Sequence, residues 1–317
     1  MEDYQGAVER LRCFAAVSEH EIVVRTRRPA DTADRAAQIG DAEALVLIRE
    51  RTPIDAPLLE LLPKLRLICQ TGRGTPHMDV DACTERGIVI CTGSGSPNAP
   101  AELTLALILA SSRRIVEDVA ALRSGTWQTT VGNELNGRTL GIVGYGTIGG
   151  LVARYCRALG MTVVAWGRAG SLERARVDGI HAEPDLDAVF ARSDVVSLHL
   201  KLSAETRGIV TPRLLASMRD EALLVNTARA GLIEHGALAN AVASGRPARV
   251  AIDVFDDEPA TGDPVLRHPS VLATPHLGYV TWETYESYFG QAFAQVAAFA
   301  DGEPRDVLNP GALRLER

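Results

Sequence analysis

Several features are scarce or missing in this 317-residue sequence. It has no excess of basic residues, and its formal net charge of -7 argues against non-specific binding to nucleic acid. Its five cysteines include no C-x-x-C pair, so we expect reduced thiols, a cytoplasmic location and no metal site. No apolar run is long enough to span a bilayer, and no signal peptide is recognisable, so we expect no membrane partner.

A glycine-rich turn between an apolar strand and a helix is the most informative stretch. Leu140–Val143 reads as a buried strand and leads directly into Gly144-x-Gly146-x-x-Gly149. Apolar residues at helical spacing follow over 151–159. Gly144 permits a tight turn, Gly146 allows close approach of a pyrophosphate, and Gly149 allows close packing of the helix on the strand. Strand, turn and helix in this order predict a dinucleotide-binding site.

Short apolar strands alternate with helices along most of the chain, which predicts parallel sheets covered on both faces. The first element reads as a helix over 3–17. A composition shift at Thr92–Pro100 reads as a hinge, and the strongly apolar helix Ala101–Ile115 reads as buried between domains or subunits. The predicted strands are Glu21–Thr26, Ala44–Ile48, Leu65–Gln70, Ile88–Cys91, Leu140–Val143, Met161–Trp166, Val195–Leu200, Ala222–Asn226, Arg249–Val254 and Val271–Thr274.

The second strand of the nucleotide-binding region ends in Trp166-Gly167-Arg168, without a carboxylate. Sites for NAD place Asp or Glu near this position to bind the ribose 2′-hydroxyl. Arg168 can pair with a 2′-phosphate, which favours NADP, or it can stack on adenine and leave NAD usable. The alternative is a solvated surface arginine, so this position leaves NAD or NADP open.

Three later strands each end in a residue type that suits acid–base chemistry. Arg229 follows one strand, Glu258 lies beyond the next, and His276 follows the last. Ligands of open parallel sheets bind outside the carboxyl ends of the strands. The guanidinium can bind a substrate carboxylate, and the imidazole can exchange a proton with a ketone or an alcohol. The glutamate can fix the tautomer of the imidazole, so the three residues together predict a catalytic site.

These motifs resemble the D-isomer-specific 2-hydroxyacid dehydrogenases over nearly the whole chain. The resemblance implies a Rossmann-type NAD(P)-binding domain, residues 98–284, inserted into a flavodoxin-like substrate-binding domain, residues 1–97 and 285–317, both with doubly wound parallel sheets. It implies that Arg229 binds the substrate carboxylate, that His276 is the acid/base with Glu258 as its partner, and that Asp253 lies near the nicotinamide carboxamide. It also implies a substrate loop at Arg73 and Gly74. The cofactor contacts it implies are Gly144, Gly146, Thr147, Ile148, Gly149, Gly167, Arg168, Leu200, Thr227, Ala228, Asp253, His276 and Gly278.

Two local departures from the family pattern stand out. Pro76-His77 replaces the Asp-Asn usual in the substrate loop, which leaves the identity of the substrate open. The sequence begins without the apolar strand that relatives carry, so we expect an N-terminal sheet that is one strand short and begins on a helix, with no strand within residues 1–8.

The expected reaction is reversible hydride transfer between nicotinamide and C2 of a small D-2-hydroxy or 2-keto acid. Arg49 and Arg51 end a strand of the substrate domain, where they can meet a second anionic group such as a phosphate or a second carboxylate. The alternative for at least one of them is solvation at the surface. One alternative is formate dehydrogenase, although that subgroup pairs its histidine with glutamine instead of a residue such as Glu258. Another is a nucleotide-sensing scaffold on the same fold. The apolar helix Ala101–Ile115 suggests a homodimer.

Overall fold

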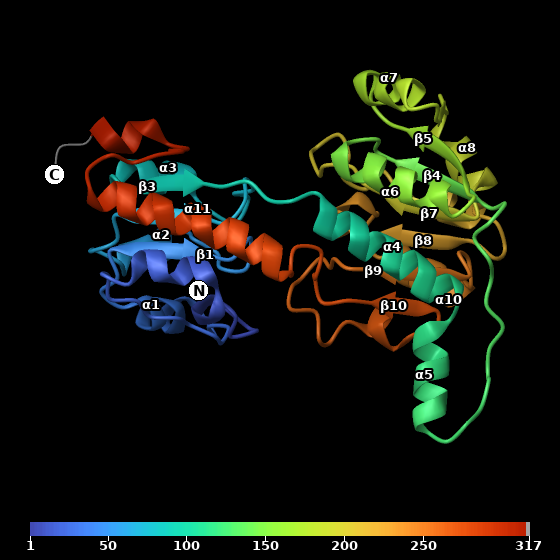
Figure 1. Cartoon of the computed structure of the whole chain (residues 1–317), viewed down its shortest axis with the longest axis horizontal. Helices are drawn as coiled ribbons and strands as arrows, with labels where there is room; N and C mark the ends of the chain where they lie inside the picture. The colour runs from blue at the N-terminus through green and yellow to red at the C-terminus, as the bar shows by residue number, and fades with distance from the viewer. Residues whose placement is uncertain (315–317) are drawn as a thin grey trace. The chain divides into compact units, whose positions relative to one another are not determined.

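The computed structural model describes residues 1–314 and forms two compact units (Figure 1). One unit contains Met1–Ser96 and Tyr279–Arg317, of which 315–317 are not described; the other contains Pro97–Gly278. The expected domain limits were 97/98 and 284/285. The first lies one residue from the observed division, and the second lies six residues beyond it.

The larger unit contains a seven-stranded parallel sheet of order β10-β9-β8-β7-β4-β5-β6. Chain order reverses between β4 and β7, which makes this a doubly wound sheet with a switch point at β4, as expected for a Rossmann-type domain. The strands are β4 (Thr139–Val143), β5 (Thr162–Trp166), β6 (His181–Ala182), β7 (Val195–Leu198), β8 (Leu223–Asn226), β9 (Arg249–Ile252) and β10 (Val271–Ala273).

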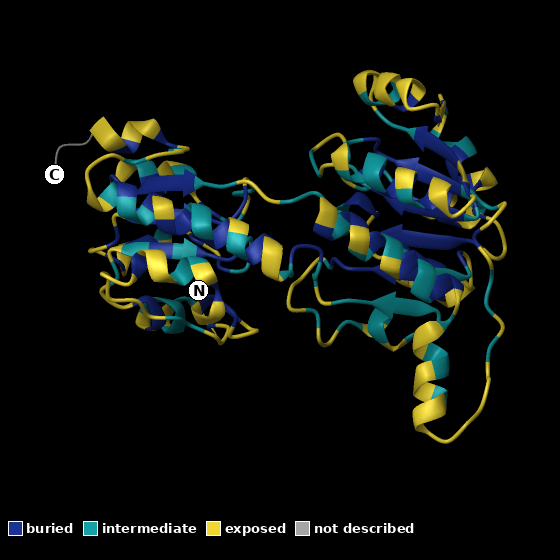
Figure 2. Cartoon of the chain, viewed as in Figure 1, coloured by how far each residue is buried: buried dark blue, intermediate teal, exposed yellow. Residues whose placement is uncertain are grey.

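Helices cover both faces of this sheet. One face packs against α4 (Asn98–Ser112), α6 (Thr147–Ala158) and α7 (Ala169–Val177). The other packs against α8 (Leu186–Arg192), α9 (Pro212–Ser217) and α10 (Ala237–Ser244). The central strands are therefore buried on both sides, as Figure 2 shows, whereas the edge strands β6 and β10 are more accessible.

Helix α4 contacts α6, β8 and β9, all within its own unit, and leaves several leucines only half-buried. After it, α5 (Ile115–Arg123) has no buried residue and projects from the unit (Figure 2).

The smaller unit contains three parallel strands in the order β1-β2-β3. They are β1 (Ala44–Leu47), β2 (Leu67–Gln70) and β3 (Val89–Thr92). One face packs with α1 (Thr32–Ile39), α2 (Ala56–Glu60) and α3 (Val80–Glu85), and the other with α11 (Trp282–Ala300). Helix α11 belongs to this unit although it is distant in sequence (Figure 1).

The first 30 residues differ in part from the sequence prediction. As expected, no strand forms within residues 1–8. The predicted helix over 3–17 is wrong, because the segment forms two 3-10 turns, η1 (Val8–Arg10) and η2 (Arg12–Val17). The predicted strand Glu21–Thr26 is also wrong. Ile22 and Val23 are exposed there, and no strand within residues 1–314 lies alongside to supply a hydrogen-bonded ladder.

Candidate active site

The glycine turn between β4 and α6 has the backbone shape that a dinucleotide requires. Gly144 adopts a positive φ of 103°, and a Cβ there would lie 2.8 Å from the backbone of His199 and Leu200. A Cβ on Gly149 would collide with the carbonyl oxygen of Gly144. Nothing lies within 4 Å of a Cβ placed on Gly146, so this side of the turn is open. The turn therefore fits a pyrophosphate at the N-terminus of α6, where the first amides have no partner in the helix.

The other predicted cofactor contacts lie around the same edge of the sheet. Thr147 and Ile148 open α6, and Gly167 and Arg168 follow β5. Leu200 lies two residues beyond the end of β7, and its backbone nitrogen borders the glycine turn. Thr227 and Ala228 follow β8, where the Thr227 hydroxyl lies 2.7 Å from that of Thr104 on α4.

An imidazole–carboxylate pair lies beyond the ends of β9 and β10. Nδ1 of His276 lies 2.6 Å from Oε2 of Glu258, and the other carboxylate oxygen accepts the backbone N–H of Phe255 at 3.1 Å. Burial by itself would raise the pKa of Glu258. The hydrogen bond and charge of His276, helped by Phe255 and the charge of Arg229, outweigh burial and lower this pKa. The pair therefore joins a carboxylate to an imidazole that can carry a proton.

Asp253, at the end of β9, holds the segment that carries His276. Its carboxylate is fully buried and accepts hydrogen bonds from the Thr274 hydroxyl at 2.6 Å and from the N–H groups of Leu277 at 2.7 Å and Gly278 at 2.8 Å. Burial raises the pKa of Asp253, although these donors and the charge of His276 act against it. His276 itself has a positive φ of 52°, which is uncommon for a residue with a side chain. The three bonds stabilise this conformation from both sides.

Arg229 begins the segment after β8, the strand next to β9. It is half-buried, and its Nη1 donates to the carbonyl of Ala228 at 2.7 Å. The buried Asn226 fixes its backbone, because the side-chain amide donates to the carbonyl of Arg229 and its oxygen accepts the N–H of Ala228. Sequence reasoning missed this role of Asn226. The signal was its position as the last residue of an apolar strand, directly before the predicted site.

The predicted substrate residues Arg49, Arg73 and Gly74 lie in the smaller unit, after the carboxyl ends of β1 and β2. The guanidinium of Arg49 lies over Gly72, where a Cβ would collide with it. It is 5.6 Å from the ring centroid of Tyr279 and 5.9 Å from that of Tyr288. Arg73 is exposed.

Neighbouring residues of the smaller unit refine the sequence interpretation. The guanidinium of Arg51 forms hydrogen bonds within the smaller unit, to the hydroxyls of Tyr279 and Tyr285 and to the carbonyl of Glu2. These bonds occupy its donors, so Arg51 is a poorer candidate than Arg49 for binding an anionic group. Both ring nitrogens of His77 are buried without a hydrogen-bond partner among residues 1–314. Burial, with the nearby charge of Arg49, lowers the pKa of His77 to about 4, so this ring is neutral at physiological pH.

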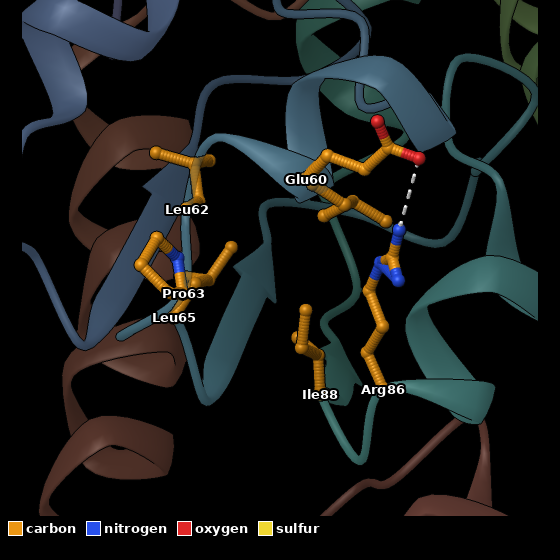
Figure 3. A pocket seen from close by; sticks show the side chains of 7 residues that line it. Glu60, Leu62, Pro63, Leu65, Arg86 and Ile88 are labelled. Atoms are coloured by element: carbon orange, nitrogen blue, oxygen red, sulfur yellow. Dashed lines mark ion pairs between the residues drawn. The ribbon is translucent and has the colours of Figure 1, made fainter.

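A hollow of about 480 Å³ lies at the amino ends of β2 and β3 (Figure 3). Five of its seven lining residues are apolar, and the other two, Arg86 and Glu60, form an ion pair of 3.7 Å. None of the predicted site residues lines it, since they follow the carboxyl ends of the strands.

The larger unit thus defines a class, a dinucleotide-binding α/β domain with an acid–base pair at the carboxyl edge of its sheet. Residues 105–278 match the family model described as D-isomer specific 2-hydroxyacid dehydrogenase, NAD binding domain. This chain belongs to the D-isomer specific 2-hydroxyacid dehydrogenase family, which confirms the resemblance inferred from its motifs.

Individual relatives agree with this placement. D-3-phosphoglycerate dehydrogenase of Mycobacterium tuberculosis H37Rv is 40% identical over 253 residues, 79% of this chain and 48% of the relative. The chain thus spans about half the length of these curated relatives. Glyoxylate reductase of Thermococcus litoralis is 33% identical over 87% of this chain and 86% of the relative. The crystal structure of a phosphoglycerate oxidoreductase from Vibrio cholerae O395 is 43% identical, with a TM-score of 0.92 over 95% of this chain and 98% of the other.

Proposed function

We propose that this chain is a D-2-hydroxyacid dehydrogenase, an oxidoreductase that moves a hydride between a nicotinamide cofactor, NAD or NADP, and C2 of a small 2-hydroxy or 2-keto acid. The observation that carries the proposal is the 2.6 Å contact between His276 and Glu258, on a domain that matches the NAD-binding domain of the family. Relatives named as D-3-phosphoglycerate dehydrogenase and glyoxylate reductase support the same reaction class.

The bound nicotinamide supplies the hydride donor or acceptor, and the side chains of this chain control the proton. Nδ1 of His276 is held by Glu258, so Nε2 is the nitrogen that gives a proton to the alkoxide formed at C2 or takes it from the alcohol. Glu258 stays ionised because its pKa is lowered, and its charge stabilises the protonated imidazole. Arg229 binds the carboxylate of the substrate through its guanidinium.

The smaller unit supplies the remaining substrate contacts in this proposal. Backbone amides at Arg73 and Gly74 bind the carboxylate, and Arg49 meets a second anionic group where the substrate has one. The support for Arg49 is its position over Gly72, with its guanidinium 5.6 Å and 5.9 Å from the ring centroids of Tyr279 and Tyr288. A small acid with a distal anionic substituent is therefore the expected substrate class.

Measuring NADH and NADPH oxidation against a panel of 2-keto acids tests the proposal. We expect turnover with at least one acid and a fall of about 10²–10⁴-fold for His276→Ala. His235→Ala is the matched control, since His235 pairs with Asp256 at 3.3 Å on an exposed part of the same unit. A protein that binds the cofactor but reduces none of these acids would instead be a nucleotide-sensing scaffold, and reaction with formate alone would assign the alternative enzyme.

We further propose that the chain forms a homodimer through α5. Ile115, Val116, Val119 and Leu122 are 41–58% exposed on this helix, and Trp127 in the following segment is 74% exposed. Apolar side chains gathered in this way mark a protein interface. Light scattering should give twice the mass of the chain, and Leu122→Glu should give the monomer mass while Arg123→Glu does not. A monomeric parent protein would contradict the proposal.

A cytoplasmic location completes the proposal. Its support is chemical, because the five cysteines are free thiols and four of them are buried, as in proteins of reducing compartments. Among residues 1–314, no helix is long and apolar enough to cross a bilayer. Fractionation of the native host with an antibody to the chain tests the location, and recovery outside the cytoplasm would refute it.

A further inference from the structure

The end of β5 faces the glycine turn. A Cβ built on Gly167 would lie 3.7 Å from the Cα of Gly144 and 3.7 Å from the backbone nitrogen of Tyr145. The β5 backbone also meets the turn, because the Gly144 N–H donates to the carbonyl of Trp166 at 2.8 Å. In a doubly wound nucleotide fold, the residues at this strand end contact the ribose of the adenosine half. Gly167 is therefore the position from which a side chain would reach the 2′ oxygen.

No carboxylate occupies that position. Gly167 has no side chain, and the space that a Cβ would enter holds the hydroxyl of Ser171, 2.6 Å away. This hydroxyl donates to the carbonyl of Arg168 at 2.8 Å, so its oxygen can still accept, and on rotation the group can donate to a ligand. The first acidic residue of α7 is Glu173, whose carboxylate pairs with Arg176 at 3.1 Å. The acid that would bind two ribose hydroxyls is thus absent from the strand end and from the first turn of α7.

Positive charge lies there instead. Arg168 is exposed, and among residues 1–314 its guanidinium has no hydrogen-bond or ion-pair partner. The charge of Arg168 contributes only a small part to the lowered pKa of Glu205, which is lowered chiefly by the hydrogen bond from the Ser203 hydroxyl. Arg174, two turns along α7, donates to the carbonyl of Tyr145 at 3.2 Å and adds a second charge beside the glycine turn.

We propose that this end of β5 selects the 2′-phosphorylated cofactor: Arg168 binds the 2′-phosphate of NADP or NADPH, and the Ser171 hydroxyl donates a hydrogen bond to it. The inference rests on the nucleotide binding contained in the proposed function, but not on its reaction. A planar guanidinium binds phosphate through paired charge-assisted hydrogen bonds, and the same charge gives no comparable contact to an uncharged hydroxyl. Arg174 raises the local potential without leaving its backbone contact.

Calorimetric titration of the full chain tests the selection without turnover. The probes are NADPH against NADH, and adenosine 2′,5′-bisphosphate against adenosine 5′-monophosphate. We expect the 2′-phosphorylated member of each pair to bind at least about 10-fold more tightly, because one charge-assisted hydrogen bond contributes about that factor in affinity. Arg168→Gln should weaken NADPH by about 10- to 100-fold and leave NADH within about twofold. Arg176→Gln removes the same charge from the same helix and should change neither.

A second variant tests the position of the missing acid. Gly167→Asp combined with Ser171→Ala, which removes the hydroxyl from the space of the new Cβ, should reverse the preference toward NADH. Equal or tighter binding of the unphosphorylated probes by the parent chain would overturn the selection and leave nucleotide binding intact, as would unchanged NADPH binding by Arg168→Gln. If none of the four probes binds at millimolar concentration, both the selection and the proposed function are wrong.

Discussion

Replacing Glu258 by glutamine tests how much the acid–base pair contributes. The carboxylate lies 2.6 Å from Nδ1 of His276, and its other oxygen accepts the Phe255 N–H. Glutamine keeps the length and one hydrogen bond but removes the charge. The change therefore isolates the electrostatic stabilisation of the protonated imidazole from the packing of the loop.

The size of the effect follows from the exposure of the pair. A hydrogen bond to a charged group contributes about 1.5–3 kcal/mol, and since the Glu258 side chain is 36% exposed, solvent screening places this pair near the lower limit. About 1.4–2 kcal/mol corresponds to a loss of roughly 10- to 30-fold in the rate of keto-acid reduction. The difference from the parent should disappear as the pH falls through the lowered pKa of Glu258, because protonation then leaves the parent with a neutral partner as well.

Single-turnover reduction of the best keto acid, measured from pH 5 to 9, provides the assay. Asp256→Asn is the matched control, because Asp256 is a nearby carboxylate that pairs with His235 and should leave rate and pH profile unchanged. Circular dichroism should show both variants folded. A Glu258→Gln enzyme with the parent rate and the parent pH profile would refute the assignment of Glu258 as the partner of the catalytic imidazole.

Three further changes probe the nucleotide-binding unit. Gly149→Ala should weaken NADPH binding at least about 10-fold in a fluorescence titration, because the new Cβ collides with the backbone carbonyl of Gly144. Gly150→Ala should have little effect, because its Cβ would lie 3.7 Å from the ring of Tyr145. Asp253→Ala leaves three donors without an acceptor and should lower the free energy of unfolding by about 3 kcal/mol or more, measured in urea; a smaller change would contradict the role of the carboxylate. Burial lowers the pKa of His199 from 6.5 to about 4, so the unfolded chain binds this proton more readily than the folded chain does. The free energy of unfolding should therefore fall by roughly 3 kcal/mol as the pH drops from 6.5 to 4. His199→Gln should remove that part of the pH dependence.

Much of the larger unit could be predicted because its strands are short apolar runs that end in distinctive residues. The six runs predicted beyond residue 138 correspond to six of the seven strands of this unit, and only β6 was not predicted. With two residues, β6 is too short to show a period, and α7 was missed because its polar sequence gives no apolar face. Gly245 ends α10 in the left-handed conformation, which a residue without a side chain adopts readily.

The beginning of the chain shows where periodicity fails. Val8 and Leu11 are buried as a helical face would predict, yet Val8 lies on a 3-10 turn and Leu11 joins that turn to the next one. Both residues belong to a cluster that includes aromatic side chains of α11. The apolar run Glu21–Thr26 has strand composition but no neighbouring strand. The local sequence pattern predicts that a side chain is buried. Whether its backbone forms a helix, a strand or a turn depends on the tertiary neighbours.

The candidate site was predicted in its residue types but not in its supports. Arg229, Glu258 and His276 could be found because each follows a strand of the same sheet. The supports are hydrogen bonds between side chains and backbone groups, from Asn226 to the Arg229 carbonyl and from the Leu277 and Gly278 N–H groups to Asp253. Sequence alone does not show which way these backbone groups point.

The three candidate catalytic residues, Arg229, Glu258 and His276, follow strands that are neighbours in one sheet, β8, β9 and β10, and the glycine turn belongs to the same compact unit. The arrangement of these residues is therefore a property of one unit alone. Arg49 and the loop at Arg73 belong to the other unit, so substitutions there leave the imidazole, its carboxylate and the glycine turn as they are. Under the proposed function, selection for a new acid can thus act on one unit while the residues for hydride and proton transfer in the other are inherited unchanged.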